Sequence, residues 1–357
     1  MRKNLMEKTS ITVPSEKNAS TTVISTSHSP VDISPMNLII AIFMLVSFLV
    51  GILVNGLFLW VLGIKMKKTV NTLWFLHLIL TYVTSSSYLP FLAVHVLLGF
   101  HWVFGIAMCK VINSVGSLGM FTTVFLLSII SLDRYLLVRH PIWSQYNRTI
   151  SRARRLIAGV WLTSLVLSVP YLAFRETRVL EDGRIECANN YAISSDGDGP
   201  RIEALKHRIH WTLFLVRFLL AFVIPFCIIM GCYCGLGWEM KKKRLARNGK
   251  PFKVLVVAVT SFFICWVPYH LYHASLLFKE TPDGLRLYLR AIFIIVMCLN
   301  FCVTPILYLF VGEKFQDVCK TSVHALLKKA FVDTSILTED DASDNDEGHP
   351  NNNQSYL

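Results

Sequence analysis

The chain has 357 residues, of which 54% are hydrophobic and only 16% are charged. Soluble domains carry about 25% charged residues, so this composition excludes an ordinary soluble protein and indicates one that lies in lipid. The net charge of +12 would suit a protein that binds nucleic acid. The positive charges, however, fall at regular places between apolar segments, as they do in membrane proteins.

After a segment rich in Ser and Thr, the chain contains seven apolar segments, each long enough to cross a hydrocarbon layer of ~30 Å as a helix. They cover roughly residues 37–64, 72–98, 105–138, 154–174, 209–237, 252–278 and 287–311. A soluble protein can contain one such segment by accident, but not seven in series. The sequence therefore predicts an all-α integral membrane protein with a bundle of seven transmembrane helices in residues 37–311.

Lysine and arginine in short loops mark the cytoplasmic side of a membrane protein. Here they follow the first, third, fifth and seventh segments, whereas the opposite loops are neutral or mix both signs. The residues are Lys65, Lys67, Lys68, Arg148, Arg152, Arg154, Arg155, Lys241 to Arg244, Arg247, Lys250, Lys314, Lys320, Lys328 and Lys329. This pattern predicts an extracellular N-terminus and a cytoplasmic C-terminus. The charge excess is then mostly topological, with some attraction to anionic lipids, and no nucleic-acid partner is expected.

Both ends of the chain are predicted to be disordered. Residues 1–36 form an extracellular N-terminus without the basic region, short apolar core and cleavage site of a signal peptide, so the first apolar segment is expected to start insertion. Asn18 stands in a glycosylation sequon on the outer side. Residues 331–357 form an acidic, polar cytoplasmic tail. Its Ser and Thr residues beside acidic ones are candidate phosphate acceptors, and a plain solvating tail is the alternative.

The nine cysteines fall into three groups. Most lie in the apolar segments and are expected to pack as small apolar residues, namely Cys227, Cys232, Cys234, Cys265, Cys298 and Cys302. Only Cys109 and Cys187 face an oxidising compartment, so they are predicted to be bonded to each other. Cys319 lies inside, beyond the seventh segment, where palmitoylation and a free thiol are both open.

The third apolar segment ends in "SIISLDRYLLVRHPIW". This places Asp133 and Arg134 at the cytoplasmic boundary, where an ion pair can be partly hydrated and can still change partners. A pair that only anchors the end of the helix is the alternative.

Prolines stand within the last three apolar segments. A proline in a membrane helix frees a backbone carbonyl and allows a bend, so Pro225, Pro268 and Pro305 give these helices places to hinge. Pro268 belongs to "FFICWVPYH", and Pro305 belongs to "TPILYLF". The following stretch "GEKFQDVCKTSVHALLKKA" has helical apolar spacing and a basic face, which predicts a short amphipathic helix on the inner membrane surface in residues 312–330.

These motifs, in this order, resemble those of the rhodopsin family (class A) of G-protein-coupled receptors over residues 37–330. The resemblance implies a two-state bundle that a ligand biases from outside, a heterotrimeric G protein as partner, and no enzymatic activity, metal or cofactor. In this family Arg134, held by Asp133 in the inactive state, repacks when the inner face opens. The implied activation and coupling residues are Asp133, Arg134, Tyr135, Tyr233, Pro268, Pro305 and Tyr308.

Finer motifs resemble the leukocyte chemoattractant receptors, the group of formyl-peptide, chemerin and prostaglandin D2 type 2 receptors. They are "VNTLWFLHLIL", "HWVFGIAMCK", "LDRYLLVRHPIWSQYNRT", "PYLAFRET", "DGRIECANNY" and "YLFVGEKF". The resemblance implies a G protein of the inhibitory type, and arrestin and receptor kinases as partners of the tail.

The chain departs from this family at three positions that together form a sodium pocket. Tyr82 replaces an aspartate, Thr304 replaces the asparagine usual before the seventh-segment proline, and Gly119 stands where relatives often carry asparagine. Without the carboxylate the cation has no strong oxygen ligand, so the sodium site is predicted to be lost. Ser117 and Leu213 also depart from the formyl-peptide signature, which makes formylated peptides poor candidate ligands.

One arginine, Arg217, lies in the middle of the apolar run "FLVRFLLAF". If its helix begins near Ile209, it lies about 12 Å along the helix at 1.5 Å per residue, where a charge costs at least ~2.5–3.5 kcal/mol. A side chain that points into a water-filled cavity avoids this cost. The resemblance implies a basic residue that contacts acidic ligand groups. A structural arginine bonded to backbone carbonyls is the alternative.

The same resemblance implies the rest of an outer ligand cavity. Arg175, just past the fourth segment, matches a second arginine near a ligand carboxylate, and Trp266 is the pocket-floor residue that responds to ligand. The implied ligand-binding residues are Arg217, Arg175, Tyr269, Met120, His270 and Trp266. The expected ligand is an acidic lipid or peptide.

Three rival functions are weighed against this receptor. A transporter usually shows repeated halves and broken helices, and no such repeat is visible. An intramembrane enzyme would need a catalytic motif, and none is recognisable in this sequence. A scavenging or arrestin-biased receptor of the same fold is disfavoured by the intact Asp133-Arg134-Tyr135, although Tyr82 and Thr304 leave room for it.

Overall fold

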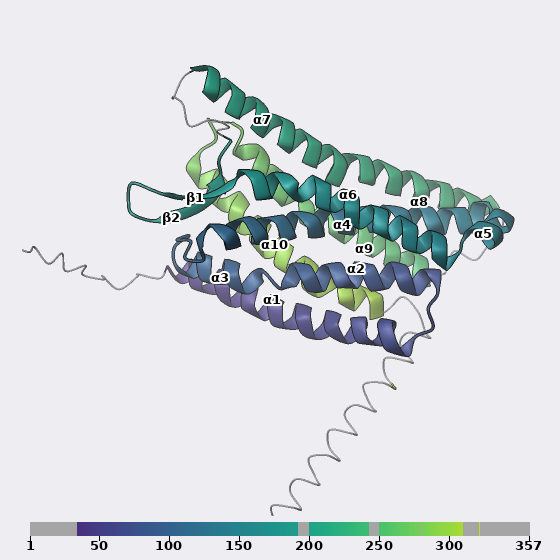
Figure 1. The fold of residues 1–357 in the computed structure, drawn as a ribbon. Coiled ribbons are helices and arrows are strands. Elements are labelled where there is room, and N and C mark those ends of the chain that lie inside the picture. The colour runs from purple at the N-terminus through teal and green to yellow at the C-terminus, as the bar shows by residue number, and fades with distance from the viewer. Residues whose placement is uncertain (1–33, 192–199, 243–249, 279, 310–320, 322–357) are drawn as a thin grey trace, which may run out of the picture. The chain divides into compact units, whose positions relative to one another are not determined.

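The computed structural model describes residues 34–191, 200–242, 250–278, 280–309 and 321 (Figure 1). The predictions for Asn18, Cys319 and the tail 331–357 lie outside the described residues, as does all of the predicted amphipathic helix 312–330 except residue 321.

The described chain is helical except for one hairpin. In chain order the elements are α1 (Pro35–Trp60), η1 (Val61–Lys65), α2 (Val70–Ser86), α3 (Leu89–Leu97), α4 (Gly105–Arg139), α5 (Pro141–Asn147), α6 (Ile150–Phe174), β1 (Arg175–Val179), β2 (Ile185–Asn189), α7 (Pro200–Phe218), η2 (Leu219–Val223), α8 (Ile224–Lys242), α9 (Lys250–Ser275) and α10 (Asp283–Leu309). The elements η1 and η2 are short π-helical turns. Among the described residues, six helical stretches are long and apolar enough to cross a membrane, and α9 covers most of the remaining predicted segment.

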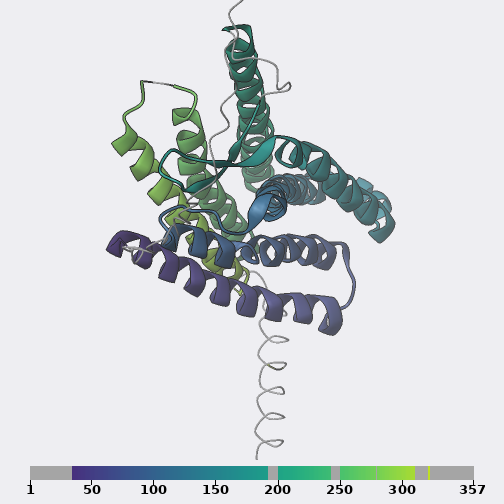
Figure 2. The same cartoon turned by 60° about the vertical axis from the view of Figure 1, so that its left-hand side comes forward.

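Helix α4 occupies the centre of the bundle, where it contacts α2, α6 and α8 (Figure 2). Its side chains Met120, Val124, Leu127 and Ile130 are fully buried. The pairs α1 with α10 and α9 with α10 complete the ring of contacts. The hairpin lies at the Gly105 end of α4, and α5 lies at its other end (Figure 1).

Local sequence explains where several helices begin. At the start of α2, Thr69 accepts a hydrogen bond from the Thr72 amide and Thr72 accepts one from the Thr69 amide, a reciprocal capping box. Thr149 caps α6 through the amide of Arg152. These caps fix where α2 and α6 begin.

The structure differs from the sequence expectation at the start of the fifth transmembrane helix and in the loop before it. The fifth transmembrane helix begins at Pro200, so the expected start near Ile209 is wrong by nine residues. Residues 201–208 are rich in charged side chains, yet they form helix, aided by the ion pair of Lys206 with Glu203 at 2.8 Å. The loop between α6 and α7 also contains an antiparallel hairpin, β1 with β2, in which Thr177 faces Cys187. It was not predicted because its short strands of mixed polarity show no clear alternation.

Candidate functional site

The predicted disulfide is confirmed, since Cys109 bonds to Cys187 with a Cα–Cα distance of 5.8 Å. It joins β2 to the first turns of α4. The hairpin is further held where the guanidinium of Arg184 donates to the Gly99 carbonyl at 3.0 Å. These links hold the hairpin, and with it Arg175 at the beginning of β1, beside the Gly105 end of α4.

Arg217 is buried, with 9% of its surface exposed. Its Nη1 donates a hydrogen bond to the hydroxyl of Tyr269 at 2.9 Å, and that hydroxyl lies 3.3 Å from the hydroxyl of Tyr171. Its guanidinium carbon lies 5.0 Å from the centre of the Tyr171 ring, within cation–π range. The partners come from α6 and α9, so side chains of three helices converge on the charge. None of these partners is a backbone carbonyl, which was the alternative role for the arginine.

Arg175 lies close to the same aromatic ring. Its guanidinium carbon is 5.8 Å from the Tyr171 ring centre, and its Nη1 donates to the carbonyl of Cys187 at 3.1 Å. Burial, together with the nearby positive charge of Arg217, lowers the pKa of Arg175 from its ordinary value, while Tyr171 acts in the opposite direction. Among the described residues, no carboxylate forms an ion pair with either arginine. The site therefore holds two positive charges and aromatic neighbours.

The structure groups most of the predicted ligand residues around Tyr269. The Trp266 ring meets Tyr269 edge-on at 5.1 Å between centres, and the His270 ring lies at the same distance. His270 is buried among aromatic rings of α7 and η2. Met120 is buried in the common apolar core, but no described contact joins it to Arg217. Tyr171 also belongs to this cluster, but the sequence analysis does not predict it. Its position four residues before Arg175 is the only signal in the sequence that could have indicated it.

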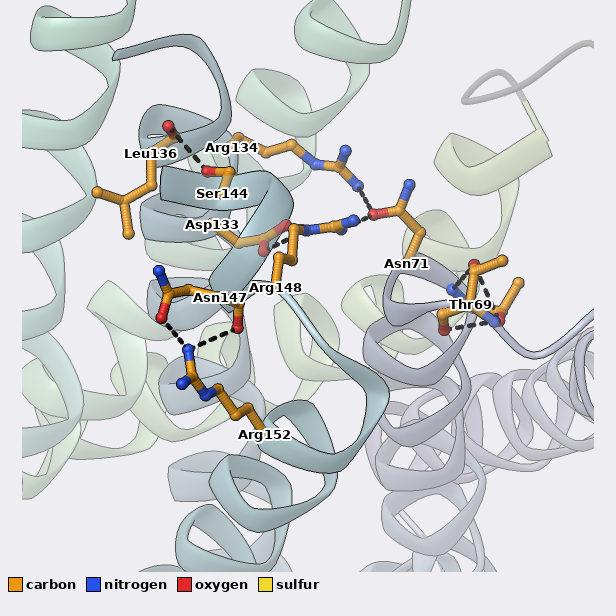
Figure 3. Close-up of polar contacts among 10 residues, drawn as sticks. Thr69, Asn71, Asp133, Arg134, Leu136, Ser144, Asn147, Arg148 and Arg152 are labelled. Carbon is orange, nitrogen blue, oxygen red and sulfur yellow. Dashed lines mark hydrogen bonds and ion pairs between the residues drawn. The ribbon is translucent and has the colours of Figure 1, made fainter. Parts of the chain in front are cut away.

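A second cluster lies at the other end of α4, where Asp133 binds Arg148 rather than Arg134 (Figure 3). Arg148 donates from Nε and Nη2 to the two carboxylate oxygens of Asp133, at 2.7 and 3.0 Å. Arg134 instead donates from Nη2 to Oδ1 of Asn71 at 2.9 Å, and the same oxygen accepts a hydrogen bond from Arg148. The expectation that Asp133 holds Arg134 is therefore wrong for this conformation, because a bidentate arginine from the α5–α6 junction occupies the carboxylate.

The other predicted activation residues lie around this cluster. The Tyr233 hydroxyl lies near Ser131 and Arg134. Tyr135 packs on α8 at Gly235, where a Cβ atom would come within 2.7 Å of the ring. Pro268 lies within α9, and Pro305 and Tyr308 lie in the last turns of α10, where the side chains are outside the described part of the chain. Asn71 and Arg148 were missed as functional residues because only the fold brings them to Asp133 and Arg134.

Residues 54–308 match the model of the family described as "7 transmembrane receptor (rhodopsin family)". The chain belongs to the rhodopsin family. It is 46% identical over 321 residues to "Probable G-protein coupled receptor 33" of Homo sapiens, covering 90% of this chain and 95% of that protein. It is 44% identical to the Mus musculus protein of the same name over 89% and 95% of the two chains. It is 38% identical to "Chemerin-like receptor 1" of Rattus norvegicus, over 78% of this chain and 76% of that one.

These findings confirm the predicted family, its chemoattractant group and the seven-helix fold. The protein is a multi-pass receptor of the plasma membrane rather than an enzyme, and membership of the family implies coupling to a heterotrimeric G protein. A transporter is thereby excluded.

Two of the positions for which the resemblance implied a sodium pocket, Tyr82 and Gly119, are closely packed by neighbouring side chains. Tyr82 is buried, and its ring meets that of Phe301 edge-on at 6.5 Å between centres. Gly119 leaves room for Ser85, whose Oγ lies where a Cβ at Gly119 would otherwise stand. The missing carboxylate is thus replaced by aromatic and hydroxyl packing. The side chain of Thr304 lies outside the described residues.

Proposed function

We propose that this receptor binds the acidic group of a lipid or peptide in its outer cavity and signals through a heterotrimeric G protein of the inhibitory type. The observation that carries the proposal is the pair Arg217 and Arg175. Both guanidiniums lie on the Tyr171 ring, and neither has a carboxylate partner among the described residues.

A ligand anion would supply the missing counter-charge. A buried guanidinium loses its hydration, and aromatic faces offset only part of that loss. A carboxylate or phosphate offers charge-assisted, bidentate hydrogen bonds, which are roughly twice as strong as neutral ones. One of the similar proteins is named for chemerin. A peptide supplies such a carboxylate at its free C-terminus, so peptides stay among the candidate ligands beside acidic lipids.

The same cluster can transmit ligand binding to the packing of the helices. Arg217 donates to Tyr269, and Tyr269 packs on Trp266. An anion that draws Arg217 away from this hydroxyl therefore alters the packing of Trp266 near the Pro268 hinge in α9. A ligand that interacts differently with two conformations shifts their populations.

The roles at the opposite end follow from the proposed orientation, with the N-terminus extracellular and the C-terminus cytoplasmic. Arg134, Tyr135, Tyr233 and Tyr308 then face the G protein, after Asp133 and Asn71 exchange their partners. Arrestin and receptor kinases act on the tail.

The experiment compares acids with their neutral counterparts. Cells that express the receptor are exposed to acidic lipids and to peptides with a free C-terminus, and to the methyl ester or amide of each compound. We expect inhibition of cyclic-AMP production by some acids and a more than tenfold loss of potency in the neutral form. Equal potency of acid and ester contradicts the anion site. Arrestin recruitment without nucleotide exchange on any G protein would instead support a scavenging or arrestin-biased receptor, for which Tyr82 and Thr304 leave room.

A further inference from the structure

A cavity of about 240 Å³ lies between α2, α4, α5 and α6, at the end of the bundle that carries α5. Its apolar lining includes Trp74, Ile129, Leu132 and Leu156. Leu132 and Leu156 are 42% and 52% exposed, and both belong to helices that cross the membrane. The mouth of the cavity therefore meets lipid.

The lining is polar at one end, where Asn147, Arg148 and Arg152 lie together (Figure 3). The charge of Arg148 is matched by Asp133. Arg152 is exposed, and its Nη1 donates to the carbonyl oxygen of Asn147 at 3.1 Å and to the side-chain oxygen of the same residue. Within the described residues no carboxylate pairs with Arg152. A basic group without a counter-charge thus borders an apolar cavity.

We propose that this cavity binds an anionic phospholipid of the surrounding leaflet, with its phosphate at Arg152 and part of one acyl chain against Trp74, Leu132 and Leu156. Basic residues at the membrane surface attract anionic head groups, and phosphate accepts the planar guanidinium fork. Trp143 lines the cavity and is 53% exposed, as suits an aromatic side chain at the level of the head groups.

The cavity is large enough to enclose only part of a phospholipid. Sites that enclose a whole small molecule usually measure about 300–1,000 Å³. A phospholipid needs less shelter, because the remainder of its chains stays in the bilayer. The uncompensated charge of Arg152 distinguishes this site from one for a neutral sterol, which the apolar lining alone would also accept.

The test measures lipid retained by the purified full-length receptor in native mass spectrometry. The receptor is taken from symmetric bilayers of phosphatidylserine and phosphatidylcholine, so its orientation does not affect the result. We expect retained phosphatidylserine in excess of phosphatidylcholine, and a loss of about fivefold in Arg152→Gln, the effect of one basic residue near an anionic head group. Leu156→Trp, which fills the cavity without changing the charge, should cause a similar loss.

Arg155→Gln is the matched control, because Arg155 is an exposed neighbour on α6 that does not line the cavity. It should retain phosphatidylserine as the native chain does. An equal loss in Arg155→Gln would mean diffuse attraction and would overturn the site, as would equal retention of the two phospholipids. Cholesterol that displaces phosphatidylserine and binds Arg152→Gln equally well would assign the cavity to a sterol. Melting temperatures of all variants exclude unfolding, and Leu132→Trp replaces Leu156→Trp if the latter is unstable.

Discussion

The guanidinium of Arg217 is held by neutral groups. The Tyr269 hydroxyl accepts one of its hydrogen bonds, and the rings of Tyr171 and Tyr269 face its positive charge. These contacts orient the side chain without neutralising it. A ligand anion therefore meets a donor that is already in position, which lowers the entropy lost on binding.

Arg217→Ala should abolish most of the response to an acidic agonist while leaving surface expression largely intact. Removing one partner of a buried charge pair costs about 2–5 kcal/mol, which corresponds to more than tenfold in affinity. Arg217→Lys should recover part of the loss, because the charge stays but the bidentate fork is absent. Arg208→Ala removes an exposed arginine of the same helix and serves as the control. Failure of Arg217→Ala to reach the surface, or unchanged binding, would show a structural role.

Asn71 accepts hydrogen bonds from both Arg134 and Arg148, so it restrains the arginine that has to move on activation. Hydrogen bonds to charged groups contribute about 1.5–3 kcal/mol. Asn71→Ala should therefore raise basal nucleotide exchange on the G protein, by about tenfold. Asn71→Asp keeps the acceptor and adds a negative charge, so it should lower basal exchange. If basal nucleotide exchange in both variants equals that of the native receptor, Asn71 does not have this role.

At the scale of elements, α4 and α8 approach closely because a glycine faces an aromatic ring. A Cβ atom at Gly235 would stand 2.7 Å from Cε2 of Tyr135. The contact is reinforced by the ion pair of Arg139 with Glu239 at 3.3 Å. The contact between α4 and α8 thus includes the predicted activation residue Tyr135 and requires a residue without a side chain at Gly235.

Gly235→Ala should lower the melting temperature of the receptor, because overpacking costs about 1–3 kcal/mol. Gly237→Ala, two residues along the same helix, should not, since a Cβ atom there meets nothing within 4 Å. In a receptor that already carries Tyr135→Ala, adding Gly235→Ala should lower the melting temperature little further, as expected for residues in contact. An equally large decrease with and without the Tyr135 ring would show that this ring does not cause the strain.

At the scale of the whole molecule, the packing of Tyr82 against Phe301 and of Ser85 against Gly119 joins α2 with α4 and α10. Sodium bound at this place would couple to agonist binding through one free energy shared by both ligands. Without the carboxylate that coupling has no basis. We expect sodium at physiological concentration, exchanged for potassium, to leave agonist affinity nearly unchanged. A large saturable shift that disappears on mutation of Thr304 or Tyr82 would contradict this.

The sequence alone determined the transmembrane segments, because each helix must stay apolar over the thickness of the bilayer. It also predicted the disulfide, since Cys109 and Cys187 are the two cysteines on the side that was predicted to be oxidising, and the structure confirms the bond. Arg217 stood out as a buried charge for the same reason, that lipid penalises charge. The polar helical turns before Ile209 and the hairpin were not predicted, because they lie beyond the apolar segments that lipid selects.

The tertiary structure decided which side chains meet. Hydropathy does not record how far each helix is rotated about its axis, so the meeting of Tyr171, Arg217 and Tyr269 needs the packed bundle. The partner of Asp133 was expected next to it in the chain and proved to be Arg148, fifteen residues away. Adjacent residues of a helix do not face each other, so Arg134 reaches Asn71 while the guanidinium of Arg148 binds both oxygens of Asp133.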